Sequence, residues 1–435
     1  MLSRKIGTKF LIALLIMLLA APAAFAGEQV KLIFNGKEYQ ADITLKDGTT
    51  YTSAAALKKI PGLEVGNEPI VPIRKLFESQ GGSVSWDNDN NQVIVSWREK
   101  AGDFTADELV IKYSESLKEA NTYKMKGSYQ VEYALEGIQD LIEIPDMPKM
   151  EATIEGIFQY EPMAMYMKQI MNMPMDELEE LGLSPEELEA AGLGEEMVTE
   201  IVWQDNAIYQ KNPMSDQWIV QDLAKVEGMP DINELMQITP QQSMEMMNKA
   251  GVINVFGEDV EKDGKKYYTI KNYIDADSFK KLTEETLNNF DITAFIESIG
   301  AQSDMDAQEA EDFNEMFEKV FEIILNNINT EYYIDTLIDK ETLLPDYMNF
   351  DLNMQIDFKQ LIEAIAAMEE VDETEELSKI LEMPISLELK MKGDYQLYDY
   401  GADLELPDLS NTISQEEYIQ QLMEQAEQVK QVERD

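Results

Sequence analysis

The sequence predicts an α+β fold in which long antiparallel strands alternate with separate amphipathic helices. Apolar and polar residues alternate regularly from Tyr123 to Leu135, which is typical of a long strand with one buried face. Between Asp304 and Asn327, apolar residues recur three and four positions apart, which is typical of a helix. A near repeat of the first strand at residues 385–397 indicates a second strand built on the same pattern.

Residues 1–26 have the pattern of a secretory signal peptide. Basic residues precede an apolar run at 10–21, and Ala24-Phe25-Ala26 fits the small-x-small rule for cleavage. The alternative is an uncleaved anchor, but the run is short for a span of about 20 residues. We therefore expect a mature protein that begins at Gly27, has no transmembrane segment and is extracytoplasmic, either secreted or associated with the cell envelope.

Residues 27–98 predict a small αββ unit. Asn35-Gly36 is a strong signal for a hairpin turn. A short helix is expected at 75–80, ended by Gly81-Gly82, because glycine commonly follows the end of a helix. Two alternating strands follow around a polar turn at 87–91.

The segments "NGKEY" and "VPIRKLFESQGGSVSWDNDNNQVIVSW" resemble the copper amine oxidase N-terminal-like domain, also called a stalk domain. The resemblance covers residues 27–98 and implies an envelope-associated spacer or a wall-binding module. It implies no copper, because the chain contains no histidine. A charged linker is expected at 99–103.

The composition excludes most catalytic chemistry. The chain has no histidine and no cysteine, which excludes Ser-His-Asp and Cys-His catalysis and the zinc and copper sites that need imidazole. Its 85 acidic residues make carboxylate pairs frequent by chance. A formal net charge of −50 repels nucleic acid. We expect a non-enzymatic protein with no catalytic residues and no cofactor.

Residues 104–410 predict a large second domain. Thr105 and Glu108 form a capping box for a helix that ends near Asn121. Further helices are expected after Pro240, from Asp277 and over 304–327. Strands are expected over 123–135, 152–160, 198–203, 207–210, 260–261, 267–270, 332–335, 348–356 and 385–397.

The segment "KMKGSYQ" (124–130) recurs as "KMKGDYQ" (390–396). Gly127 and Tyr129 correspond to Gly393 and Tyr395 in the same phase of alternation. Convergence on one sheet surface explains the repeat better than duplication does, because the flanking sequences are not alike. The glycines would allow both strands to bend, as a curled sheet requires.

The segment "TEYYIDTLIDKETLLP", together with a helix followed by a long strand, resembles the lipoprotein-carrier superfamily (LolA- and LppX-like). The resemblance implies a curled antiparallel sheet, an unclosed half-barrel, with inserted helices on its concave side. Carriers of this superfamily hold acyl chains between sheet and helices. Residues 411–435 are expected to form an acidic tail helix.

Methionines are concentrated between residues 163 and 175. Because alternate strand residues share a face, Met163, Met165 and Met167 could bind Cu(I), which does not require histidine. Alternatively, methionine is a pliable filler of an adaptable apolar surface, or ordinary core. The spread of methionines to other alternating positions favours the adaptable surface.

A concave sheet lined by aromatic and apolar side chains would suit a lipid acyl chain or an apolar peptide. The expected ligand-binding residues are Tyr129, Tyr133, Phe158, Met165, Tyr333, Phe350, Met391 and Tyr395. A cell-wall or envelope protein is an alternative partner. The competing interpretation is a structural envelope adaptor whose half-barrel has a filled core.

Overall fold

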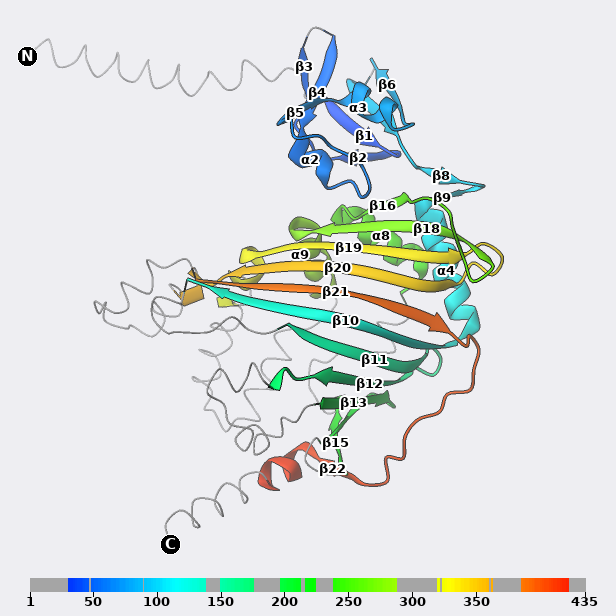
Figure 1. Ribbon diagram of the computed structural model, residues 1–435, viewed down its shortest axis with the longest axis vertical. Coiled ribbons are helices and arrows are strands. Elements are labelled where there is room, and N and C mark those ends of the chain that lie inside the picture. The colour runs from blue at the N-terminus through cyan, green and yellow to red at the C-terminus, as the bar shows by residue number, and fades with distance from the viewer. Residues whose placement is uncertain are drawn as a thin grey trace, which may run out of the picture. The chain divides into compact units, whose positions relative to one another are not determined.

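The computed structural model describes residues 30–46, 48–88, 90–137, 149–175, 196–212, 216–223, 238–287, 319–320, 323–359, 361–362 and 385–421 (Figure 1). The chain divides into two compact units, Met1–Glu99 and Lys100–Asp435, and each is described by itself. The predicted signal peptide lies outside the described residues. Within the described ranges, no helix combines the length and the apolar character that a membrane span requires.

The first unit contains two small sheets. The larger has the order β2-β1-β7-β6, in which β1 runs parallel to β7 and the other neighbours are antiparallel. Its strands are β1 (Lys31–Phe34), β2 (Lys37–Tyr39), β6 (Ser83–Asp87) and β7 (Gln92–Ser96). The smaller sheet consists of β3 (Thr44–Lys46), β4 (Thr49–Ser53) and β5 (Ile70–Pro72), and the helices are α2 (Ala54–Lys58) and α3 (Ile73–Ser79).

Trp97 lies at the centre of the first unit's core. Its side chain is 2% exposed and packs edge-on against Phe77, with ring centroids 6.3 Å apart. The Asn35 side chain donates a 3.0 Å hydrogen bond to the Trp97 carbonyl and accepts a 2.9 Å bond from its N–H. Gly81 follows α3 with a φ of 83°, a conformation that favours glycine. The predicted turn at Asn35-Gly36 and the helix-strand-turn-strand order from α3 to β7 are confirmed. The unit is larger than the predicted αββ unit, because β1 to β5 and α2 precede α3.

The second unit is built on a 13-stranded sheet with the order β16-β18-β19-β20-β21-β10-β11-β12-β13-β14-β15-β22, and β17 also pairs with β18. Its first strands are β10 (Thr122–Glu136), β11 (Met150–Gln159), β12 (Ala164–Asn172), β13 (Glu196–Gln204), β14 (Ala207–Lys211) and β15 (Trp218–Asp222). The later strands are β16 (Ile253–Phe256), β17 (Val260–Lys262), β18 (Lys265–Asp275), β19 (Ile328–Asp339), β20 (Pro345–Asp357), β21 (Ser386–Tyr398) and β22 (Thr412–Ser414). A separate short hairpin consists of β8 (Lys100–Ala101) and β9 (Phe104–Thr105).

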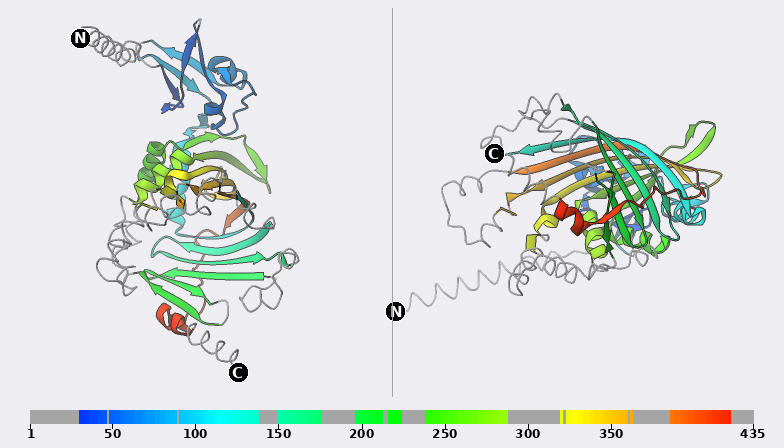
Figure 2. Two further views of the ribbon diagram at one scale, coloured as in Figure 1. Left: turned by 90° about the vertical axis from the view of Figure 1, so that its left-hand side faces the viewer. Right: turned by 90° about the horizontal axis from the view of Figure 1, so that it is seen from below.

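The large sheet is curled and open. Within the described residues, the end strands β16 and β22 do not pair with each other. Figure 2 shows the strong twist of the sheet and the helices gathered on one of its faces. The predicted α+β fold with an unclosed, curled antiparallel sheet is therefore confirmed in its architecture.

Three helices are described in full in the second unit: α4 (Ala106–Ala120), α8 (Pro240–Ala250) and α9 (Ala276–Leu287). The predicted capping box of α4 is present, with Thr105 and Glu108 bonded to each other's backbone N–H groups. Thr239 and Gln242 form a second capping box at α8. The helix expected over 304–327 lies mostly outside the described residues, apart from 319–320 and 323–327, which are helical.

The predicted tail helix over 411–435 begins later than expected. Thr412 and Ile413 are β-branched and suit a strand, and Thr412–Ser414 run parallel to Trp218–Val220 as the edge strand β22. Residues 415–421 are helical, and the rest of the tail lies outside the described residues. The start of the tail therefore covers an edge of the sheet.

In the segment "TLIDKETLLP", residues 340–344 form the turn between β19 and β20, and two buried carboxylates with the half-exposed ammonium of Lys265 hold it. Asp339 and Asp346 are 4% and 8% exposed, and Lys265 Nζ lies 3.2 Å and 2.7 Å from their carboxylate oxygens. Asp339 also accepts hydrogen bonds from the N–H groups of Glu341 and Thr342. Burial alone would raise the pKa of Asp339, but these N–H groups and the ammonium of Lys265 outweigh it and lower the pKa.

The two copies of the repeated segment lie side by side, because β10 and β21 are antiparallel neighbours at the centre of the sheet. The register places Gly127 opposite Tyr395 and Tyr129 opposite Gly393. A Cβ atom at Gly127 would lie 2.5 Å from the ring of Tyr395. Each tyrosine therefore covers the glycine of the other copy, which explains why both copies contain Gly-x-Tyr.

Replacing Gly393 by alanine is expected to destabilise the second unit. The added Cβ would lie 2.4 Å from the carbonyl oxygen of Ser128 and 2.5 Å from Cβ of Tyr129, so the strands must separate. We expect a loss of about 1 to 3 kcal/mol in the free energy of unfolding, measured by urea denaturation. Ser128→Ala, at an exposed position between the same strands, is the control and should change little. Equal midpoints for Gly393→Ala and the parent protein would contradict the close approach.

Candidate functional site

The two faces of the large sheet differ in what covers them. Leu109 of α4 and Met244 of α8 pack against Ile270 and Ile338 of the sheet in one buried cluster. We call the face that carries Ile270 the helix-bearing face and the opposite one the outer face. Leu109, Ile270 and Ile338 are each 0% exposed, so this part of the helix-bearing face is fully covered.

The helix-bearing face can be followed across the sheet through the strand register. Ile270 pairs with Thr336, Thr336 with Met348, and Met348 with Tyr395. Because paired residues in antiparallel strands point to the same face, Tyr395 shares the helix-bearing face with Ile270. The next pairing, Tyr395 with Gly127, extends this face to β10.

Every methionine on strands β10 to β13, β20 and β21 belongs to the helix-bearing face. They are Met125, Met150, Met165, Met167, Met171, Met197, Met348, Met354 and Met391. All of them are half-buried, in contrast to the fully covered residues under α4 and α8. Outer-face positions of the same strands carry no methionine and are mostly polar or charged. The sheet therefore presents a broad surface of thioether side chains on one side only.

Aromatic side chains form the middle of this surface. Tyr129, Val131, Ala152 and Phe350 make a buried cluster. Phe350 stacks on Tyr395 with ring centroids 5.3 Å apart and an interplanar angle of 13°. The partly buried side chains packed against the cluster are Tyr133, Met171, Tyr332, Leu389, Met391 and Tyr395. The structure thus brings together most of the residues that the sequence predicted for ligand binding.

Phe158 and Met165 lie on the same face in a neighbouring group. They are paired across β11 and β12. Phe158 contacts Tyr160 with ring centroids 4.7 Å apart and Tyr123 at 5.4 Å. This aromatic group lies on the face predicted to bind ligand, but it does not belong to the cluster around Phe350.

Tyr333 was wrongly predicted to line the concave surface. Its register partner is Asp351, which places it on the outer face, where its ring lies 4.6 Å from that of Tyr273. Tyr332 lies instead on the helix-bearing face, where its ring centroid is 6.4 Å from that of Phe350. Two adjacent tyrosines fit either phase of alternation, so the sequence alone could not choose between them.

Only two of the three methionines predicted to bind Cu(I) lie together on one face of the sheet. Met165 and Met167 share the helix-bearing face, whereas Met163 lies in the turn before β12. Register partners of the two strand methionines are Phe158, Gly156, Trp203 and Ile201. The cross-strand methionine pair is instead Met171 with Met197, which sequence reasoning missed because it requires the register. Among the described residues, no group of histidine, cysteine and carboxylate side chains could hold a metal ion.

The site is electrically neutral at ordinary pH. Burial raises the pKa of Tyr395 to about 12, with smaller contributions from Tyr129 and Tyr332. Burial also raises the pKa of Tyr129, and Tyr133 adds to the shift. On the helix-bearing face, the register positions of β10, β11 and β21 carry no charged side chain. The arrangement suits apolar contact and adaptable packing.

No protein-family model and no curated protein matches the chain. Solved structures with some similarity include LprF from Mycobacterium bovis, with 9% identity, a TM-score of 0.29, and 70% of this chain and 96% of that chain covered. The lipoprotein LppX from Mycobacterium tuberculosis gives 9% identity, a TM-score of 0.26 and coverage of 68% and 98%. A DUF1329 family protein from Desulfovibrio piger has 8% identity and a TM-score of 0.21. The match covers 68% of this chain and 93% of that chain.

Tyr395 is expected to titrate near pH 12 in the folded protein, against about 10 for a free tyrosine. Because its folded-state pKa is raised, its contribution to stability is complete below pH 10 and is lost as the pH rises towards 12. NMR of ring-labelled tyrosine, assigned with the Tyr395→Phe variant, measures this titration, and free tyrosine in the sample provides the reference. A midpoint near 10 would mean that the ring is exposed to water.

Proposed function

We propose that the chain is a non-enzymatic extracytoplasmic protein whose half-barrel unit holds an apolar ligand, a lipid acyl chain, on the helix-bearing face. The observation that carries the proposal is the gathering of half-buried methionines on that face of the central strands. Methionine is unbranched and polarisable, so a surface rich in it adapts to ligands of variable shape.

The contrast within one face supports a binding surface. Where α4 and α8 pack, Leu109 and Ile270 are 0% exposed. Away from these helices, Met391, Tyr133 and Tyr395 keep part of their surface exposed. Each square ångström of apolar surface removed from water contributes about 25 cal/mol, so an acyl chain laid on this surface would be stabilised by the area it covers.

A structural envelope adaptor with a filled core is the second candidate. The stacking of Phe350 on Tyr395 and the burial of Tyr129 favour it, because these rings already pack on each other. The two candidates differ in whether truncating a side chain on this face creates a new void or enlarges a space that a ligand fills.

The remaining parts of the chain fit an envelope location. We propose that residues 1–26 are a cleaved signal peptide and that residues 27–98 are a stalk domain that holds the half-barrel of 104–410 at the wall or envelope. A wall or envelope protein would then be its partner. The neutral, apolar character of the methionine-lined face supports binding over catalysis.

Met391→Ala separates carrier from adaptor. In a ligand-binding surface, truncation of this half-buried side chain should cost little stability, because no new closed void forms. In a filled core it should cost about 2 to 5 kcal/mol. Thermal unfolding is measured with and without added fatty acid, which should raise the melting temperature of the parent protein if a carrier site exists.

Met244→Ala is the matched control, because Met244 is 3% exposed under the helices and its loss should be costly with or without fatty acid. A large destabilisation by Met391→Ala that fatty acid does not reverse, together with no fatty-acid binding by the parent protein, would rule out the carrier and leave the adaptor.

A further inference from the structure

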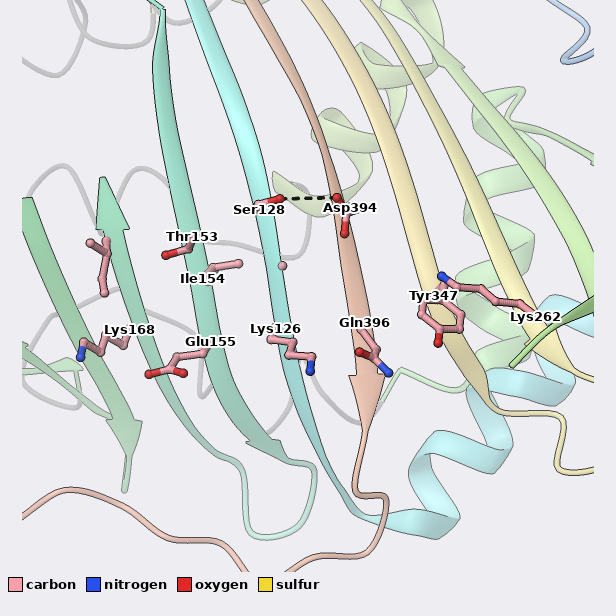
Figure 3. Close-up of a pocket in the computed structure, with 12 residues that line it drawn as sticks. Lys126, Ser128, Thr153, Ile154, Glu155, Lys168, Lys262, Tyr347, Asp394 and Gln396 are labelled. Atoms are coloured by element: carbon pink, nitrogen blue, oxygen red, sulfur yellow. Dashed lines mark hydrogen bonds between the residues drawn. The ribbon is translucent and has the colours of Figure 1, made fainter. Parts of the chain in front are cut away.

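The outer face of the sheet carries a groove that the proposed function does not use. Its volume is about 610 Å³, and it crosses strands β20, β21, β10, β11 and β12 (Figure 3). One row of register partners forms its floor: Tyr347, Gln396, Lys126, Glu155 and Lys168, in that order. At about 4.8 Å between neighbouring strands, this row is about 19 Å long. The groove is therefore suited to an extended ligand lying across the strands.

The hairpin of β17 and β18 bounds one end of the groove. Lys262 lies over the ring of Tyr347, with Nζ 3.4 Å from the ring centroid. The hydroxyl of Tyr347 donates a 3.1 Å hydrogen bond to the carboxylate of Asp263 at the tip of the hairpin. These two contacts position the ammonium of Lys262 above the floor.

Three lysines of the groove lack a carboxylate partner among the described residues. No described carboxylate lies within 4.0 Å of the ammonium groups of Lys126, Lys168 and Lys262. Lysines elsewhere on the same face are paired: Lys124 with Asp399 at 3.3 Å, Lys390 with Glu388 at 2.9 Å and Lys392 with Asp351 at 3.5 Å. In a chain with 85 acidic and 35 basic residues, three lysines without a described carboxylate partner line this one groove.

Hydroxyl, amide and carboxylate groups lie between these lysines. The hydroxyl groups of Ser128 and Thr153 and the amide of Gln396 line the groove. Glu155 and Asp394 also face it, and Asp394 lies 3.5 Å from the hydroxyl of Ser128. A densely charged polyanion would meet these two carboxylates, whereas a ligand with widely spaced anionic groups can avoid them.

We propose that this groove binds an acidic oligosaccharide, a chain of sugar units with separated carboxylate groups. Its carboxylates would pair with Lys126, Lys168 and Lys262, and its hydroxyl groups would bond to Ser128, Thr153 and Gln396. Lysine suits this role because its ammonium is a compact charge with three donors on a flexible stem. The polar lining does not suit an acyl chain, so the two faces of the sheet would take ligands of opposite character.

The net charge of −50 opposes the approach of any anion, so binding depends on the local lysines and not on the overall field. The contacts are open to solvent and should weaken as sodium chloride is added. Loss of one exposed ion pair between a lysine and a ligand carboxylate is expected to weaken binding about 1.5- to 5-fold.

The experiment measures binding of a galacturonate oligomer to the full secreted chain by calorimetry, with a neutral maltose oligomer and polyglutamate as comparison ligands. The variant Lys126→Met, Lys168→Met, Lys262→Met is expected to lose at least about threefold in affinity. Its matched control is Lys124→Met, Lys390→Met, Lys392→Met, which removes the same charge from the same face outside the groove. The control should keep most of the affinity, and thermal unfolding checks that both variants are folded.

Three outcomes would overturn the proposal. The first is no binding of galacturonate by the parent protein. The second is an equal loss in both triple variants, which would assign the effect to general charge. The third is tighter binding of polyglutamate with the same lysine dependence, which would assign the groove to an acidic peptide.

Discussion

The reciprocal pairing of Gly127 with Tyr395 and of Gly393 with Tyr129 holds the centre of the large sheet in register. A glycine leaves room for a ring only when the partner strand presents that ring at the matching position. A slip by one residue would turn every side chain of a strand to the opposite face. The separation of methionines on one face from lysines on the other therefore depends on this pairing.

One sheet thus provides two chemically different surfaces. The helix-bearing face is closed by α4 and α8 over β18 and β19 and is lined by methionine and aromatic side chains over the central strands. The outer face is polar and contains the lysine groove. Because a strand alternates its side chains between two faces, the sequence KMKG can supply Met391 to one surface and Lys390 to the other.

The absence of histidine and cysteine limits the side-chain chemistry that both surfaces can use. Without these residues, the chain has no histidine whose charge would change between pH 5 and 8, and no thiolate for metal binding. The recognition that we propose uses apolar contact on one face and lysine charge on the other. The buried carboxylates of Asp339 and Asp346 share the half-exposed ammonium of Lys265, and these ion pairs link β18, β19 and β20.

The sequence by itself determined the fold class, the hairpin turns, the capped helix at Thr105 and the in-phase residues of each strand, because these depend on local periodicity and turn chemistry. Only the tertiary structure decided that β10 lies between β11 and β21, that Tyr332 and not Tyr333 faces Phe350, and that Met171 pairs with Met197. Alternation relates residues within one strand but leaves the phase between strands undefined. The lysine groove lies across two sets of strands that are distant in the chain, β10 to β12 and β20 to β21, so it exists only once the register joins them.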